Sequence, residues 1–156
     1  MQYVSTRGDP REIDFKEATL LGLADDGGLY LPKVWPRLPT FSLNDNYIDI
    51  ATKVIFLFTG HTIPYKDLYN VINQSYSNFS DKDLLPLEQI KENHWILELF
   101  NGPTLAFKDI ALQFLASIFD YFLERDKNKT TIIGATSGDT GSAAIEAFKD
   151  KKNIDI

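Results

Sequence analysis

The chain has 156 residues, of which 44% are hydrophobic and 24% charged, a balance typical of a globular protein with a substantial core. Its 22 acidic and 16 basic residues give a net charge of −6, so we do not expect a nucleic-acid partner. No apolar run approaches a membrane span and residues 1–14 are too polar for a signal peptide, so we expect no membrane partner and a cytoplasmic protein. Cysteine is absent and His61 and His94 stand alone, so no metal site is predicted.

The first forty residues are predicted to form a short strand, a helix and a tight turn. The helix is expected to begin at Asp14 or Phe15 and to end at Leu21. Asp26-Gly27-Gly28 lies between apolar flanks, which predicts a hairpin turn. The adjacent carboxylates of Asp25 and Asp26 also suggest a metal pair, but a turn needs Asp and Gly for backbone reasons alone. Three prolines then predict an extended connection across residues 31–40.

Two helices with apolar residues at helical spacing are predicted between residues 41 and 83. The core face of the first is expected to comprise Tyr47, Ile50, Ala51, Val54, Ile55 and Phe58. Ser42 or Asn44 is the expected cap of that helix. The second helix has Pro64 near its start. Its expected core face is Leu68, Val71, Ile72, Tyr76 and Phe79. Nothing in this region suggests chemistry.

Strand and helix alternate from residue 95 onward. Strands are predicted over 95–100 and 130–135, and helices over 107–125 and from Gly141 to Lys149. A β-α-β-α order predicts a parallel sheet with a right-handed crossover. The two loops that follow the strands should lie at the sheet edge where ligands bind. A change of composition over 85–93 makes the best domain boundary.

Lys108 is the first candidate site residue, within the segment NGPTLAFKDIALQFL. At roughly 100° per residue it begins an apolar stripe, while Asp109 is predicted to lie on the solvent-exposed face. The stripe continues through Leu112, Leu115, Phe119 and Phe122. A lysine directed at a core tends toward the neutral amine that attacks carbonyls, as a Schiff-base lysine must. The alternative is an ordinary lysine whose methylene stem lies along the surface, and periodicity alone leaves both open.

The second candidate site is the loop GATSGDTGSAA, residues 134–144. Its glycines let the backbone approach a ligand, and the free N–H groups at a helix start favour an anion such as a carboxylate or phosphate. No lysine follows the glycines and their spacing is wrong for a dinucleotide loop, which excludes the two common phosphate-binding motifs. The alternative is a tight strand-to-helix turn with Asp139 or Thr140 as the helix cap.

Four motifs together resemble the threonine synthase family, pyridoxal-phosphate enzymes of the tryptophan-synthase-like fold. They are YVSTRG (residues 3–8), GLADDGGLYLP (22–32), FNGPTLAFKD (100–109) and ATSGDTGSAA (135–144). The resemblance covers most of the chain and implies an α/β fold in two parts. A small helical N-terminal domain with a β-hairpin would occupy residues 1–86. The beginning of the parallel-sheet, pyridoxal-phosphate-dependent catalytic domain would occupy residues 87–156.

The resemblance also implies an activity and residue roles. Members of the family convert O-phosphohomoserine and water to threonine and phosphate. By the resemblance, Lys108 binds pyridoxal phosphate covalently and later moves protons. The substrate-binding residues implied are Ser137, Gly138, Asp139, Thr140 and Gly141, which would hold the carboxylate of this small-molecule substrate.

Members of this family are much longer than 156 residues. We therefore expect a truncated chain with an incomplete active site, weak cofactor binding and no activity alone, whose partner is the missing C-terminal part. A different hypothesis is a non-catalytic truncated product or a module that self-associates through uncovered strand edges. A third is a dehydratase or β-replacement enzyme of the same fold, although such relatives lack the N-terminal domain.

Overall fold

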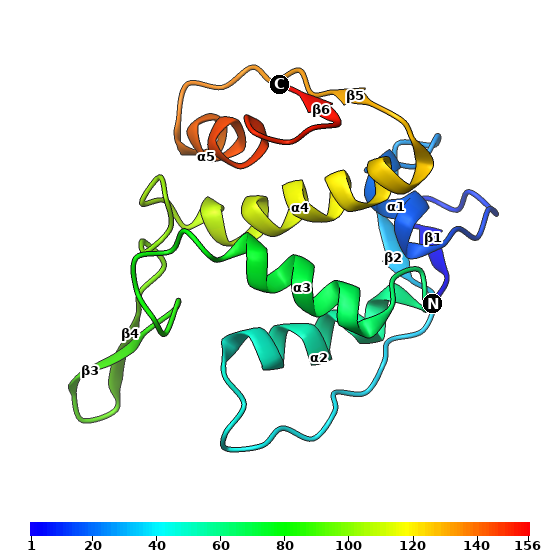
Figure 1. The fold of residues 1–156 in the computed structure, drawn as a ribbon. Helices are drawn as coiled ribbons and strands as arrows, with labels where there is room; N and C mark the ends of the chain where they lie inside the picture. The colour runs from blue at the N-terminus through cyan, green and yellow to red at the C-terminus, as the bar shows by residue number, and fades with distance from the viewer. The chain divides into compact units, whose positions relative to one another are not determined.

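A computed structural model describes all 156 residues as a mixed α/β chain with five helices and three two-stranded sheets (Figure 1). The chain divides into two units, Met1–Asn70 and Val71–Ile156. The first unit contains β1 (Tyr3–Ser5), α1 (Phe15–Leu21), β2 (Tyr30–Pro32) and α2 (Tyr47–Thr59). The division falls within α3 (Tyr65–Ser75). The second unit contains β3 (Leu87–Lys91), β4 (His94–Leu97), α4 (Lys108–Asp126), β5 (Thr130–Thr131), α5 (Asp139–Phe148) and β6 (Ile154–Asp155).

The predicted turn after α1 is confirmed. Ala24 N donates to Gly28 O at 2.9 Å, and Gly27 has a φ of +75°, in the left-handed region that glycine adopts without strain. Beyond the turn, β2 pairs antiparallel with β1, with Leu31 opposite Val4. The turn thus returns the chain to the N-terminal strand.

The Asp26 side chain ties this turn to the N-terminal segment. Its carboxylate accepts hydrogen bonds from Ser5 Oγ at 2.7 Å, from Asp9 N at 2.9 Å and from Gly28 N at 2.8 Å. The bonds from Ser5 and Gly28 hold the pKa of Asp26 below its usual value. Asp25 instead forms an ion pair with Arg11 at 2.8 Å and is largely exposed. The two carboxylates therefore have separate structural roles.

Helices α1 and α2 each begin at a polar cap residue, but only the cap of α1 is the predicted one. Asp14 caps α1 in a capping box with Glu17, as the predicted start implies. The cap of α2 is Asn46, in a capping box with Asp49, so the prediction of Ser42 or Asn44 is wrong. Ser42 Oγ accepts from Asn44 N at 3.2 Å and closes a turn ahead of the helix instead.

The predicted core face of α2 is also wrong in part. Ile50 is 38% exposed, whereas Thr52 and Thr59 are fully buried. These threonines are buried at low cost because their hydroxyls donate to carbonyls of their own helix, Ile48 O and Phe56 O. In α3 the prediction is confirmed for Leu68 and Ile72, which are both buried, and Tyr76, directly after the helix, is buried as well.

In the second unit α5 packs along α4 (Figure 1). The Phe119 and Phe148 rings meet edge to face with centroids 6.3 Å apart, and Phe122 is 1% exposed. A parallel pair joins the strands on either side of α5, with Thr130 opposite Ile154. A parallel strand-helix-strand unit is therefore present as β5-α5-β6, whereas the parallel pairing predicted between the strands at 95–100 and 130–135 is wrong, because these strands belong to different sheets.

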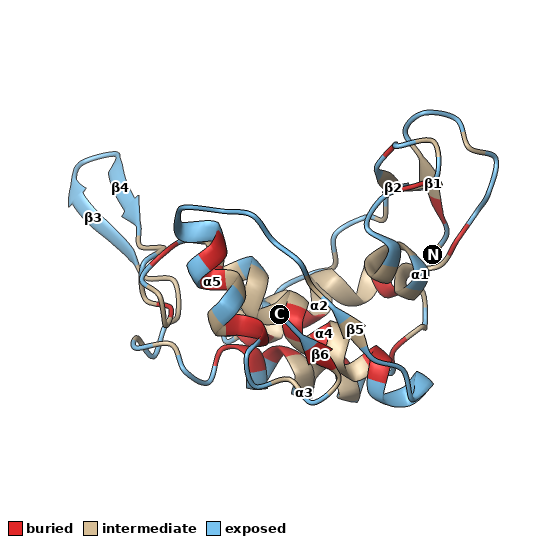
Figure 2. Cartoon of the chain, turned by 90° about the horizontal axis from the view of Figure 1, so that it is seen from above, coloured by how far each residue is buried: buried red, intermediate tan, exposed pale blue.

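The strand predictions before α4 need correction. The expected strand over 95–100 is β4, but it pairs antiparallel with β3, with Leu87 opposite Leu97. Its two-residue link, Glu92 and Asn93, uses a φ of +58° at Asn93 and favours a hairpin over a parallel partner. Every residue of this hairpin is exposed (Figure 2). The hairpin includes most of the expected 85–93 boundary, and the strand expected over 130–135 is only β5. The domain boundary at 86/87 stays a prediction.

Two further properties follow from the helices and the acidic side chains. None of the five helices combines the length and the apolarity needed to cross a bilayer. No three histidine, aspartate or glutamate side chains converge in an arrangement that would hold a metal ion.

Candidate functional site

Lys108 is the first residue of α4 and is half-buried. Its Nζ lies 4.7 Å from the centroid of the Phe107 ring, a cation–π contact. Phe107 is the residue at the helix cap and makes no side-chain capping bond. Of the apolar stripe expected to continue from Lys108, Phe122 is fully buried and Leu112, Leu115 and Phe119 are half-buried.

Asp109 does not lie on a solvent-exposed face, as the periodicity predicts, because it is 0% exposed. Its two carboxylate oxygens accept hydrogen bonds from Thr104 N and Thr104 Oγ1, both at 2.8 Å. The loop before α4 thus covers the side chain and supplies its partners. Helical spacing predicts only which face of the helix a residue lies on, and not whether a neighbouring loop buries that face.

The second loop is exposed over residues 133–140 and enters α5 at Asp139. Gly138 is the cap residue, and no side chain makes a capping hydrogen bond, so the prediction of Asp139 or Thr140 as cap is wrong. The chain turns at Gly138 because its carbonyl accepts from Gly141 N at 3.0 Å. The N–H groups of Asp139 and Thr140 make no hydrogen bond within the chain.

Two glycines of this loop have open surroundings, and the third is crowded. A Cβ at Gly134 or Gly138 would meet no heavy atom within 4 Å, so the backbone there is accessible to a ligand. A Cβ at Gly141 would lie 2.0 Å from Thr136 Cγ2, so only glycine fits under Thr136. Behind the loop is a mostly apolar cavity of about 210 Å³, lined by Ile132, Gly134, Thr136, Gly141, Ala144, Ile145 and Ile156. The loop combines free N–H groups and hydroxyls, which suits an anion.

Both candidate loops lie in the second unit, each at the N-terminal end of one of two helices that pack together. Lys108 makes no hydrogen bond or ion pair with residues 137–141. The Thr104–Asp109 contact is the feature that the sequence analysis missed. The sequence signal for this contact was a threonine five residues before an aspartate in the first turn of a predicted helix.

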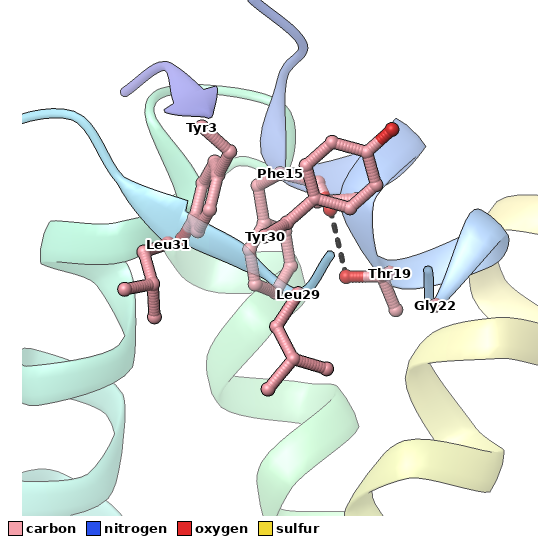
Figure 3. A pocket seen from close by; sticks show the side chains of 8 residues that line it. Tyr3, Phe15, Thr19, Gly22, Leu29, Tyr30 and Leu31 are labelled. Atoms are coloured by element: carbon pink, nitrogen blue, oxygen red, sulfur yellow. Dashed lines mark hydrogen bonds between the residues drawn. The ribbon is translucent and has the colours of Figure 1, made fainter. Parts of the chain in front are cut away.

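Two other cavities offer fewer groups suited to catalysis or to binding an anion. One of about 300 Å³ in the first unit is lined by the rings of Tyr3, Phe15 and Tyr30 with Leu29 and Leu31 (Figure 3). Within it, Thr19 Oγ1 donates to Phe15 O at 2.7 Å, and no acid, base or cation other than tyrosine lines it.

The third cavity, of about 140 Å³, is polar and lies in the second unit. Lys151 Nζ donates to Ser117 Oγ at 3.1 Å, and burial lowers the pKa of Lys151. Asn153 Nδ2 donates to Asp120 Oδ1 at 3.0 Å. These contacts fasten the segment after α5 to α4.

Comparison with known proteins gives a consistent result along the chain. Residues 2–76 match a family described as threonine synthase N terminus. Threonine synthase of Pseudomonas aeruginosa is 42% identical and is aligned with 100% of this chain and 34% of its own length. Threonine synthase of Saccharomyces cerevisiae is 44% identical over 99% of this chain and 34% of its own. The chain thus spans about a third of the length of these relatives.

Solved structures agree. A crystal structure of PLP-bound threonine synthase from Brucella melitensis has a TM-score of 0.91 and 46% identity, covering 99% of this chain and 34% of that one. The structure of the yeast threonine synthase has a TM-score of 0.88 and 42% identity, with coverage of 98% and 34%.

Proposed function

Since this chain corresponds to the N-terminal third of threonine synthases, we propose that it supplies the reactive lysine and the substrate-carboxylate loop of such an enzyme. The reaction is the conversion of O-phosphohomoserine and water to threonine and phosphate, with pyridoxal phosphate as cofactor. The observation that carries the proposal is the fit of the whole chain to a PLP-bound threonine synthase at a TM-score of 0.91.

The residues of this chain fit part of the cofactor's needs. Lys108 offers a half-buried primary amine at the start of a helix, beside an exposed aromatic ring. Pyridoxal phosphate, when bound, supplies electron withdrawal that stabilises a carbanion on the substrate. Lys108 would hold the cofactor and, once released from it, carry protons away from Cα and Cβ of the substrate.

The loop would hold the substrate by its α-carboxylate. The free N–H groups of Asp139 and Thr140 and the hydroxyls of Ser137 and Thr140 are donors for an anion at the start of α5. Gly138 leaves the approach open, and Gly141 lets the helix begin tightly against Thr136. The role of the loop is therefore to orient the substrate rather than to react with it.

We propose that the remaining two thirds of a threonine synthase is the partner that completes the site. The test joins residues 1–156 to the C-terminal two thirds of the Pseudomonas aeruginosa enzyme and measures phosphate release from O-phosphohomoserine. We expect activity in the joined protein, a loss of roughly 10³-fold or more in Lys108→Ala, and little change in the exposed control Lys66→Ala. Equal activity of Lys108→Ala and the parent would overturn the assignment of the lysine.

The chain alone should release no phosphate at an enzyme-like rate, because two thirds of the relatives' length has no counterpart in it. Turnover by the purified chain that depends on Lys108 would contradict this part of the proposal. Turnover of serine or threonine in preference to the phosphorylated substrate by the joined protein would instead favour a dehydratase.

One observation favours the non-catalytic alternative, a self-associating module. Hairpin β3–β4 exposes Leu87, Ile90, Trp95, Ile96 and Leu97, each by 47% or more. Unpaired edges with exposed apolar side chains favour pairing with another chain. Sedimentation of the chain over a range of concentrations tests this, and a monomer throughout counts against it.

A further inference from the structure

Asp109 is a buried carboxylate whose environment is supplied by the loop immediately before Lys108. It is 0% exposed in the first turn of α4, and its two carboxylate oxygens accept hydrogen bonds from the backbone and the hydroxyl of Thr104. A buried carboxylate is costly unless hydrogen bonds compensate it, and a helix N-terminus adds favourable electrostatics. The contact is therefore a specific junction between loop and helix.

Gly102 makes the junction tighter. A Cβ at this position would lie 2.4 Å from Asp109 Cβ and 2.5 Å from Asp109 Oδ2, so the loop backbone rests directly on the aspartate. Gly102 is buried, and its carbonyl accepts from Leu105 N at 3.1 Å. Any side chain at residue 102 would lift the loop from the helix.

The same loop contains a strained residue. Leu105 has a φ of +62°, in the left-handed region that a branched, non-glycine residue seldom adopts. Such a conformation persists only where the surroundings hold it. Thr104, which directly precedes Leu105, is the residue bound at two points by Asp109.

We propose that Asp109 is the positioning residue for Lys108. By fixing Thr104 and the strained turn against the first turn of α4, it sets the direction in which the Lys108 side chain leaves the helix. The inference rests on the proposed function, in which Lys108 reacts with pyridoxal phosphate and so needs a defined direction. It assigns a role to a hydrogen-bonded geometry, and not to the negative charge of Asp109.

Asparagine provides the discriminating substitution. In Asp109→Asn the amide oxygen can accept from Thr104 N, and the amide N–H can donate to the Thr104 hydroxyl, which also accepts. The geometry is kept and the charge removed. Asp109→Ala removes both bonds, and Thr104→Val removes one bond with little change of volume. Thr19→Val, in the first unit, is the matched control, since Thr19 Oγ1 also makes one intramolecular bond.

The experiment uses the 156-residue chain with pyridoxal phosphate. Borohydride reduction traps the lysine adduct irreversibly, so weak binding still accumulates product, and peptide mass spectrometry gives the yield at each lysine. The yield at Lys108 is divided by the yields at the exposed Lys66 and Lys82, which serve as internal references. Far-UV circular dichroism checks the fold of every variant.

We expect the parent to prefer Lys108 and Asp109→Ala to lower that preference by roughly 10- to 100-fold, because small misplacements of a reacting group have large effects. Asp109→Asn and Thr19→Val should stay close to the parent, and Thr104→Val should fall between. Should Asp109→Ala fail to fold, Thr104→Val still tests the same contact.

Four outcomes would overturn the inference. A folded Asp109→Ala with undiminished preference for Lys108 excludes a positioning role. A loss in Asp109→Asn as large as in Asp109→Ala assigns the effect to charge. If the parent shows no preference for Lys108 and the joined protein is inactive, the proposed function fails and this inference fails with it. If the joined protein is active and its Asp109→Ala variant turns over normally, only this inference fails.

Discussion

The two units of this chain are stabilised by different means. In Met1–Asn70, polar side chains close the turns and caps, with Asp26 bound to three segments and capping boxes on α1 and α2. In Val71–Ile156, helix packing around Phe122 dominates, and the hairpin and the second loop are exposed. Both candidate site loops lie in the second unit. The two candidate loops therefore lie in the unit that depends more on helix packing, and the Thr104–Asp109 contact is the side-chain bond that holds the first of them.

The largest effect should come from the apolar core of the second unit. Phe122→Ala removes a fully buried ring and should lower the free energy of unfolding of that unit by about 3–5 kcal/mol. Phe100→Ala, at a ring that is 52% exposed, is the control and should cost far less. Hydrogen exchange of the α4 amides measures both. Similar losses in the two variants would contradict the view that packing around Phe122 dominates the stability of the second unit.

Asp26→Ala should have the next largest effect, confined to the first unit. It removes an acceptor of bonds from Ser5, Asp9 and Gly28, and should lower the thermal midpoint of that unit by roughly 5–10 °C. Asp25→Ala removes only an exposed ion pair with Arg11 and should change little. Equal midpoints in these neighbouring variants would show that the carboxylate does not hold the turn.

The same carboxylate predicts an acid dependence. Because the pKa of Asp26 is lowered in the folded state, its stabilising contribution is present above the ordinary carboxyl pKa and is lost as pH falls through the lowered value. Acid should therefore destabilise the parent more than Asp26→Ala, as measured by the thermal midpoint between neutral pH and roughly pH 3. Parallel curves for the two proteins would contradict this.

Gly141→Ala sets two opposing effects against each other. Alanine is the better helix former by about 1 kcal/mol, but its Cβ would lie 2.0 Å from Thr136 Cγ2. We expect the clash to win, with a net loss of about 1–2 kcal/mol at the start of α5. Adding Thr136→Ser removes Cγ2 and should recover part of the loss. If Gly141→Ala is more stable than the parent, the loop at Thr136 can move aside without cost, which would contradict the expected clash.

The smallest effect concerns Tyr3, whose hydroxyl donates to Phe58 O at 2.9 Å. Tyr3→Phe should cost about 1 kcal/mol at neutral pH. Burial raises the pKa of Tyr3 to about 12 from 10.0, so the parent loses stability as pH rises through this interval, because the unfolded state deprotonates first. The alkaline limb of a thermal unfolding series should therefore be steeper in the parent than in Tyr3→Phe.

Local signals predicted the first unit well. The helix from Phe15 to Leu21 and the turn at Gly27 depend on nearby residues, and both are confirmed. The buried face of α3, the helix that contains the division between the units, is confirmed for the same reason. The buried threonines of α2 were not predicted, because their hydroxyls are satisfied by their own helix and the residue type alone does not reveal it.

Long-range pairing explains the misses in the second unit. Periodicity correctly gave α4 but placed Asp109 in solvent, since the residue that covers it lies in the preceding loop. Alternation of strand and helix suggested a parallel partner for β4, whereas the turn at Asn93 selects β3. The sequence did predict that each candidate loop leads into a helix. The site roles of Lys108 and residues 137–141 stay proposals.

The exposed hairpin has a spectroscopic consequence. The chain has two tryptophans, Trp95 in β4 of the second unit and Trp35 in the first, where its ring lies edge-on to Phe58 with centroids 6.2 Å apart. Each unit therefore carries its own indole fluorophore. Replacing one tryptophan by phenylalanine leaves emission from a single unit, so the unfolding of the two parts can be followed separately in the intact chain.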